Sequence, residues 1–280
     1  MEYQPIILIG AARSGTKILR DTISTHPEIN KIKYDINFIW KKYSEHINHD
    51  ELSVEDISPK FKKFIKYYFK KNSKGKPFII EKTVSNTLRI PFLLELFPNA
   101  KFIILYRDGR DVVESVRRQW NVVPPVSYQL KKMLSIPVFQ VIPYLFKYAL
   151  NIIKLKLNPN RSTKSHVWGV KYKGYENDMN DDLLTFCSKQ WIHCANAIIE
   201  NQNKIPLANK LIIRYEDLVM DPKNQFQEIA EFLDLNFQQF DYLSIKPANI
   251  GKAVKSLDDK EYNSMNLILK DTLKRLGYNE

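Results

Sequence analysis

The segment that most constrains the fold lies near the N-terminus and reads PIILIGAARSGTK (residues 5–17). Its first part, residues 5–9, is an apolar run that predicts a buried strand. A loop with Gly10 and Gly15 follows, and residues 17–24 then have the spacing of a helix. A strand, a glycine loop and a helix bind anions, because backbone N–H groups and the positive helix end point at the same oxygens. The segment therefore predicts a phosphate-binding loop in an α/β fold.

The loop nearly matches the nucleotide-binding pattern G-x-x-x-x-G-K-[ST], because Gly10 and Gly15 have the right separation. Thr16 stands where that pattern has its lysine, and Lys17 stands where it has the hydroxyl that binds magnesium. A P-loop nucleotide kinase or hydrolase that uses ATP and magnesium is therefore disfavoured and is kept as the alternative. A plain strand-to-helix turn is the other reading, but Arg13 and neighbouring hydroxyls coincide with both glycines, which favours a binding site.

Other apolar runs predict further strands at residues 78–80, 101–106 and 211–214. Helical spacing predicts the intervening and following helices near residues 61–74, 88–97, 110–120, 180–200, 222–233 and 261–276. Strands that alternate with helices predict a single three-layer, P-loop-like α/β domain with a central, mostly parallel sheet flanked by helices. We expect this domain to span residues 1–280, with an inserted helical or cap segment at about residues 121–166, which fits the alternation poorly.

Composition narrows the function classes only a little. The 280-residue chain is 44% hydrophobic, as in ordinary globular proteins. It has two cysteines, Cys187 and Cys194, whose helical spacing predicts reduced thiols packed on one face, so a disulfide scaffold is excluded. No cysteine or histidine cluster has zinc spacing, and we expect no metal site. The net charge of +12 favours anionic partners, but much of it is lysine in solvated stretches such as residues 60–76.

A second basic segment reads KFIILYRDGRDVVESVRRQW and repeats the logic of the first. Arg107 stands at the carboxyl end of a strand, where ligands bind in open α/β sheets. Ser115 follows on the predicted helix, and Arg118 lies one turn beyond it. These three residues could grip a second phosphate, away from the first loop. Taken alone the pattern is weak, because Arg107 could simply pair with Asp108 or Asp111.

Together the two segments resemble the 5′-phosphosulfate loop and the 3′-phosphate site of sulfotransferases that use 3′-phosphoadenylyl sulfate (PAPS). ARSGTK is similar to the P-R-S-G-T-T loop of that family, and the second segment is similar to its strand-R-D-x-R-x-x-x-x-S pattern. Other family-like stretches follow in the same order, and they are His26-Pro27, Glu81-Lys82-Thr83, RYEDLVMDP and IKPANIGKAVK. The last resembles a late loop of protein-tyrosine sulfotransferases and their bacterial relatives. The resemblance covers most of the chain except residues 121–166.

The resemblance implies transfer of a sulfuryl group from PAPS to a hydroxyl acceptor, with PAP as product and no metal. The residues that it implies for nucleotide binding are Arg13, Ser14, Gly15, Thr16, Lys17, Arg107, Ser115, Arg118, Tyr215 and Lys255. Tyr215 is expected near the adenine and Lys255 near the 3′-phosphate. Arg13 and Lys82 are the expected cations for the transition state. Lys17 departs from the family pattern, and it either aids binding or points away.

Transfer to a hydroxyl also needs a base for the hydroxyl proton. In relatives a glutamate follows the His-Pro pair, and Asp35 stands at about that place in this chain. We expect Asp35 to be the base, although a plain surface carboxylate fits the pattern equally well. Glu81 is the second candidate, and His166, in the inserted segment, is the third.

The acceptor cannot be read from the sequence, since fold does not set substrate; a glycan, a tyrosine and a small molecule all stay open. Nucleic acid is not an expected partner. Residues 133–157 are apolar but are interrupted by prolines and lysines, so we expect a buried cap or a peripheral membrane contact there, not a membrane span. The N-terminal segment does not resemble a signal peptide, and we expect a cytoplasmic protein of open oligomeric state.

Overall fold

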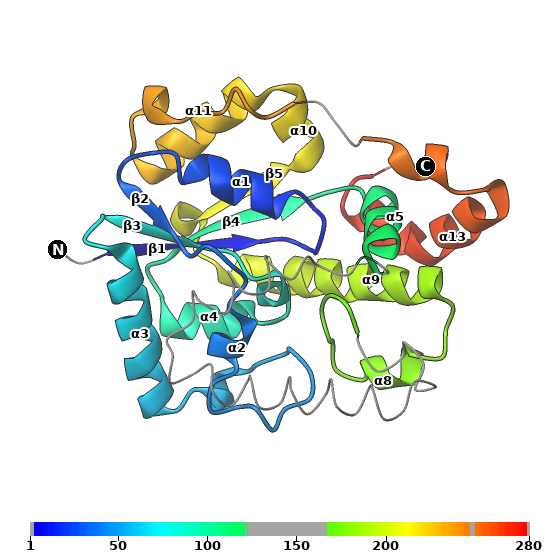
Figure 1. Cartoon of the computed structure of the whole chain (residues 1–280), viewed down its shortest axis with the longest axis horizontal. Coiled ribbons are helices and arrows are strands. Elements are labelled where there is room, and N and C mark those ends of the chain that lie inside the picture. The colour runs from blue at the N-terminus through cyan, green and yellow to red at the C-terminus, as the bar shows by residue number, and fades with distance from the viewer. Residues whose placement is uncertain (1–2, 121, 123–166, 247–249, 279–280) are drawn as a thin grey trace. The chain divides into compact units, whose positions relative to one another are not determined.

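A computed structural model of the chain describes residues 3–120, 122, 167–246 and 250–278 (Figure 1). The chain forms two compact units, residues 1–117 with 169–280, and residues 118–168. The predicted insertion at residues 121–166, including the segment 133–157 and His166, lies outside the described residues except for residue 122. The first unit contains the sheet and the predicted phosphate loop.

The sheet of this unit has five parallel strands in the order β2-β3-β1-β4-β5. The strands are β1 (Gln4–Ile9), β2 (Ile29–Lys31), β3 (Phe78–Glu81), β4 (Lys101–Tyr106) and β5 (Lys210–Arg214). In register, Ile7 of β1 pairs with Glu81 of β3 on one side and with Phe102 of β4 on the other. Strand order therefore reverses around β1, and the carboxyl ends of β3, β1 and β4 share one edge, where ligands of open α/β sheets bind.

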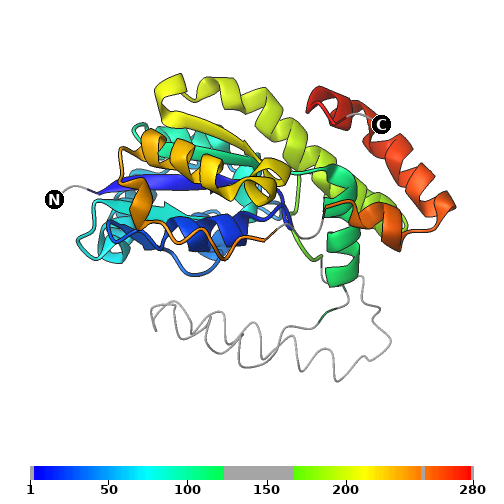
Figure 2. The same cartoon turned by 90° about the horizontal axis from the view of Figure 1, so that it is seen from above.

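Helices cover both faces of the sheet, which confirms the predicted α/β class (Figures 1 and 2). The described helices with four or more residues are α1 (Thr16–Ile23), α2 (Asn37–Trp40), α3 (Pro59–Ser73), α4 (Ile90–Leu96), α5 (Gly109–Trp120), α8 (Tyr175–Asp178), α9 (Leu183–Asn201), α10 (Tyr215–Met220), α11 (Pro222–Leu233), α12 (Lys252–Ser256) and α13 (Asp259–Arg275). Helices α1, α10 and α11 lie on one face, and α3, α4 and α9 lie on the other.

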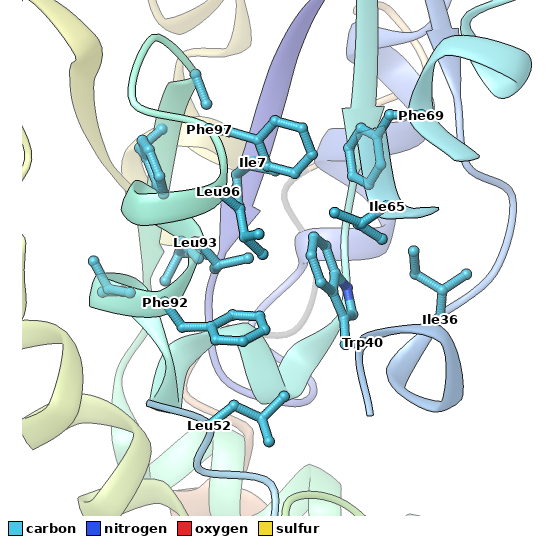
Figure 3. Close-up of a cluster of buried hydrophobic side chains, with 14 of the residues drawn as sticks. Ile7, Ile36, Trp40, Leu52, Ile65, Phe69, Phe92, Leu93, Leu96 and Phe97 are labelled. Carbon is cyan, nitrogen blue, oxygen red and sulfur yellow. The ribbon is translucent and has the colours of Figure 1, made fainter. Parts of the chain in front are cut away.

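Each face of the sheet has its own apolar core, because alternate side chains of a strand point to opposite faces. On one face, Ile7 packs in a cluster with Trp40, Phe69 and Phe92, whose rings surround the indole (Figure 3). On the other face, the side chains of β1 pack against buried residues of α1 and α11, including Phe226. A parallel sheet that is covered on both faces needs apolar side chains at nearly every position, as β1 and β4 show.

Helix α9 brings α5 close to the body of the unit. A Cβ atom added at Gly109, the first residue of α5, would lie 2.7 Å from the ring of Trp191 on α9, so this contact requires glycine. Trp191, Cys187 and Cys194 are all buried on α9, and neither cysteine forms a disulfide, as the helical spacing predicts. The backbone of α5 is thereby fixed next to the carboxyl end of β4.

Candidate functional site

The phosphate loop (residues 10–15) joins β1 to α1, as predicted. Gly15 has a φ of 97°, and a Cβ there would overlap the ring of Tyr215, so the loop requires glycine at this position. Gly10 is similarly confined, because its Cβ would lie 2.6 Å from Thr16 and 2.9 Å from the Leu105 carbonyl oxygen. Arg13 also has a left-handed backbone, with a φ of 66°. The sequence thus places glycine where the chain must turn tightly.

The loop leaves the N-terminus of α1 open to an anion. Within the described residues, no side chain caps α1 and its first turn has no acidic residue. The Ser14 hydroxyl donates to the Ala11 carbonyl oxygen at 2.7 Å, which closes the turn of the loop. The backbone N–H groups and the positive end of the helix dipole are then arranged as in anion-binding loops.

The second basic segment meets the loop directly. The Arg13 Nε donates to the Ser115 hydroxyl at 3.0 Å, and the Arg107 Nη1 donates to the Arg13 carbonyl oxygen at 2.8 Å. The Arg107 guanidinium also lies 4.3 Å from the centre of the Tyr215 ring. The residues expected to hold a second phosphate therefore contact the first loop through Arg13. Strands β1 and β4 are neighbours, so Arg13 and Arg107 lie side by side at their carboxyl ends.

Lys17 and Arg118 differ from the rest of the predicted nucleotide set. The Lys17 side chain is 77% exposed on the outer side of α1 and forms an ion pair with Asp21 at 3.6 Å. The lysine side chain that departs from the family pattern therefore points away from the loop. Thr16, beside it, is buried as the first residue of α1. Arg118 is exposed on α5 and belongs to the second compact unit, so its place relative to the loop is not described.

Asp111 also belongs to this site, although its position in the sequence suggested only an ion pair with Arg107. Its carboxylate oxygens accept hydrogen bonds from the backbone N–H groups of Gly251 at 2.8 Å and Ala253 at 3.0 Å. The same carboxylate lies 3.8 Å from Arg107 Nη2. Asp111 therefore fastens the start of α12, which carries the predicted Lys255, to the helix that carries Ser115. The buried position of Asp111 strengthens these bonds.

The RYED stretch after β5 supports the same edge of the sheet. Glu216 accepts a hydrogen bond from the Asp108 backbone N–H at 3.0 Å and another from the Tyr278 hydroxyl at 2.9 Å. Tyr215, expected near an adenine, is 2% exposed and lies against both Gly15 and Arg107. In this structure the Tyr215 ring packs against the phosphate loop at Gly15 and stabilises it.

At the end of β3 the structure brings the predicted base and cation together. The Lys82 Nζ donates to Asp35 Oδ1 at 2.5 Å, and the Val84 backbone N–H points to Asp35 Oδ2 at 3.5 Å. The Lys82 side chain is 10% exposed and that of Asp35 is 32% exposed. Asp35 is therefore both fixed and reachable from solvent, which a plain surface carboxylate need not be. This pair supports the choice of Asp35 as a base.

Glu81, the second candidate for the base, has a different environment. Its side chain is fully buried and accepts hydrogen bonds from the Thr83 hydroxyl at 2.5 Å and the Asn86 amide at 2.6 Å. Burial raises the pKa of the Glu81 carboxyl above its usual range. Full burial and these two hydrogen bonds leave the Glu81 carboxylate without access from solvent, which favours Asp35 over Glu81 as the base. His166, the third candidate, lies outside the described residues.

Among residues 3–120, 122, 167–246 and 250–278, no group of three or more histidine, cysteine, aspartate or glutamate side chains is arranged to hold a metal ion. Over the same residues, no helix is both long enough and apolar enough to span a bilayer.

A parallel α/β sheet whose central strand ends in an anion-binding loop defines the P-loop-like class of folds. Within that class the chain belongs to the sulfotransferase family, whose profile matches residues 5–135 and 158–239. Protein-tyrosine sulfotransferase A of Caenorhabditis elegans is 23% identical over 82% of this chain. The alignment covers 50% of that relative, so this chain spans about half its length.

Solved structures of sulfotransferases share the fold. The sulfotransferase domain of the Synechococcus PCC 7002 olefin synthase matches 100% of this chain and 96% of its own, with a TM-score of 0.57 and 16% identity. A mouse sulfotransferase complexed with PAP matches 97% of this chain and 85% of its own, with a TM-score of 0.52 and 14% identity. At these identities the likeness concerns the fold alone.

Proposed function

We propose that this protein transfers a sulfuryl group from PAPS to a hydroxyl acceptor. One observation carries the proposal: the Lys82–Asp35 pair stands at the end of β3, directly beside the strand that ends in the phosphate loop. A base with a partner cation on one strand and an anion-binding loop on the next are the groups that this transfer needs. Membership in the sulfotransferase family supports it.

In the proposed reaction, Asp35 accepts the proton of the acceptor hydroxyl as the hydroxyl oxygen forms a bond to sulfur. The bond between sulfur and the bridging phosphate oxygen breaks, and PAP leaves with the electron pair. Lys82 and Arg13 stabilise the negative charge on the transferring group and on the leaving phosphate. Ser14, Gly15 and Thr16 hold the 5′-phosphosulfate through the loop and the start of α1.

The 3′-phosphate is held by Arg107 and Ser115 in this proposal, with Lys255 supplied by α12. The mouse sulfotransferase of similar fold was solved with PAP, which supports PAPS as the nucleotide. The kinase alternative is disfavoured, because Lys17 lies on the outer side of α1 instead of over the loop. A Walker lysine must reach the β- and γ-phosphates.

The first acceptor class to test is tyrosine in a peptide, because the curated relative is a protein-tyrosine sulfotransferase. Glycans and small hydroxylated molecules follow in the same screen. We also propose that the protein works in the cytoplasm, since two buried free thiols suit a reducing compartment. Cell fractionation tests that placement, and recovery from a secreted fraction would contradict it.

Calorimetric titration with PAP tests the nucleotide site without knowledge of the acceptor. We expect micromolar affinity in the wild type and a loss of at least about tenfold in Arg13→Ala and in Ser115→Ala, which remove one partner of a charge-assisted bond. Arg275→Ala is the matched control, because Arg275 lies on α13 and bonds Asn196. Binding of ATP with magnesium but not of PAP would refute the proposal and favour the kinase.

A further inference from the structure

The hydroxyl of Thr83 lies between a buried carboxylate and the segment that carries Asp35. Thr83 Oγ1 donates to Glu81 Oε1 at 2.5 Å and accepts a hydrogen bond from the Ile36 backbone N–H at 2.9 Å. Thr83 is 1% exposed and Glu81 is 0% exposed, so water does not compete for either bond. The hydroxyl thus connects the end of β3 to the residue that follows Asp35.

Glu81 fixes the direction of this hydroxyl. The Thr83 hydroxyl directs its proton at Glu81 Oε1. The oxygen lone pairs of Thr83 are then left for the Ile36 N–H. The second oxygen of Glu81 is occupied by the Asn86 amide at 2.6 Å, which prevents the carboxylate from rotating away. Glu81 and Thr83 therefore act as one unit.

Ile36 is fixed through both its side chain and its backbone. Its side chain is 3% exposed and belongs to the apolar cluster around Trp40, while its N–H bonds to Thr83 (Figure 3). Asp35, one residue earlier, has its carboxylate oriented by Lys82 and by the Val84 N–H. Thr83 thus fixes the backbone next to Asp35, while Lys82 and Val84 orient the Asp35 carboxylate. The hydrogen-bond partners on both sides come from residues 82–84, directly after β3.

We propose that Glu81 and Thr83 are positioning residues that hold Asp35 in the geometry needed for proton transfer. The inference rests on the proposed function, in which Asp35 exchanges the acceptor proton. In each turnover that proton moves between the acceptor oxygen and the Asp35 carboxylate, and neither Thr83 nor Glu81 gains or loses one. A loss of the Thr83 hydroxyl therefore impairs proton transfer without touching the nucleotide.

The reverse reaction provides a direct test, because the leaving phenol can be varied. With PAP as sulfuryl acceptor, protonated Asp35 donates its proton to the departing phenolate oxygen. A weakly basic phenolate such as p-nitrophenolate leaves with little help, whereas the phenolate of tyrosine needs the proton. The test compares p-nitrophenyl sulfate with tyrosine O-sulfate in the wild type, Thr83→Val, Thr83→Ser and Asp35→Asn.

We expect Thr83→Val to lower kcat by about tenfold or more with tyrosine O-sulfate and by about twofold or less with p-nitrophenyl sulfate. The KM for PAP should stay within about twofold of the wild type. Thr83→Ser keeps the hydroxyl and should restore the rate with both donors. Asp35→Asn should show the same dependence on the leaving group with a larger loss. A structural defect alone would lower both rates equally.

Hydrogen exchange measures the link without any acceptor. The Ile36 amide should exchange faster in Thr83→Val than in Thr83→Ser. The comparison requires that the two variants have similar melting temperatures. Both should bind PAP with the affinity of the wild type. Equal loss with both sulfate donors, or unchanged exchange at Ile36, would overturn the positioning role. Failure of the proposed function looks different, because the wild type would then not bind PAP, or Asp35→Asn would keep full activity.

Discussion

The ends of β1 and β3 are neighbours on one edge of the sheet, but their side chains are held in opposite ways. At β1, Arg13 is exposed on a loop with left-handed backbone, and its contacts come from Arg107 and Ser115, which follow the neighbouring strand β4. At β3, Glu81, Lys82 and Thr83 are all buried, and their partners come from residues 35, 36 and 86. The first region is arranged to receive a ligand, and the second is arranged to fix a carboxylate. The predictions below test whether binding and chemistry divide along this line.

The largest effect is expected from Asp35→Asn, which removes the proposed base and keeps the shape of the side chain. kcat for sulfuryl transfer should fall by about 10²–10⁴-fold, the usual contribution of general base catalysis. PAP affinity, measured by calorimetry, should stay within about twofold, because Asp35 belongs to the β3 side. A loss of PAP affinity as large as the loss of kcat would contradict the division between nucleotide binding at β1 and chemistry at β3.

Arg107→Ala should have the opposite profile. It removes a guanidinium that bonds the Arg13 carbonyl oxygen and covers the Tyr215 ring, so the loop loses a support and the proposed 3′-phosphate site loses a cation. We expect PAP affinity to fall by about 10- to 100-fold, as for one or two lost charge-assisted bonds. The rate at saturating PAPS should change less than the affinity. An unchanged dissociation constant would contradict the proposed nucleotide site.

Asp111→Ala tests whether α12 is part of the nucleotide side. Two backbone N–H groups at Gly251 and Ala253 lose their acceptor, and the segment that carries Lys255 is released. We expect PAP affinity to fall by about five- to tenfold, less than for Arg107→Ala. Lys255→Ala is the comparison variant. Equal PAP affinity in wild type and Asp111→Ala would mean that this fastening serves the fold alone.

The smallest effect on nucleotide binding is expected from Lys17→Ala. The Lys17 side chain points away from the loop. Its ion pair with Asp21 is exposed to solvent, so screening makes the contribution of this pair to stability small. PAP affinity should change by no more than about twofold. A larger loss, measured by the same titration, would mean that Lys17 turns toward the phosphosulfate when the nucleotide binds.

The thiols of α9 belong to neither region and provide a pH test of the core. Burial raises the pKa of Cys187 and of Cys194 to about 12 from the ordinary 9.0. The folded state therefore favours the protonated thiols; their contribution to stability is full below pH 9 and is lost as pH rises toward 12. Urea unfolding should show the wild type losing stability relative to a Cys187→Ala, Cys194→Ala variant above pH 9. A constant difference would contradict the raised pKa values.

Local sequence patterns predicted most of the strands and the phosphate loop correctly. Apolar runs and glycines located β1, β3, β4, β5 and the phosphate loop, because each is determined within a few consecutive residues. Strand β2 was missed, since it has three residues and two of them are polar. Helix α10 was missed as well, because six residues give too short a period to recognise.

The contacts that assemble the site were not predictable in the same way. Lys82 and Asp35 are 47 residues apart, and only the family resemblance suggested that both belong to one site. Asp111 and Gly251 are 140 residues apart, and nothing local to either marks the bond between them. Thr83 was noticed only as part of a family-like stretch. Such long-range pairs depend on how the strands are ordered, which sequence periodicity does not encode.

The backbone of Arg13 has a consequence for how this chain can be stabilised. Its φ of 66° lies where a side chain costs about 1–2 kcal/mol and glycine costs almost nothing. Arg13→Gly should therefore unfold at higher urea concentration than Arg13→Ala, although both lack the guanidinium. A search for thermostable variants would favour glycine at position 13 and lose the cation in doing so. At this position the backbone conformation favours glycine, whereas the proposed function requires the cation.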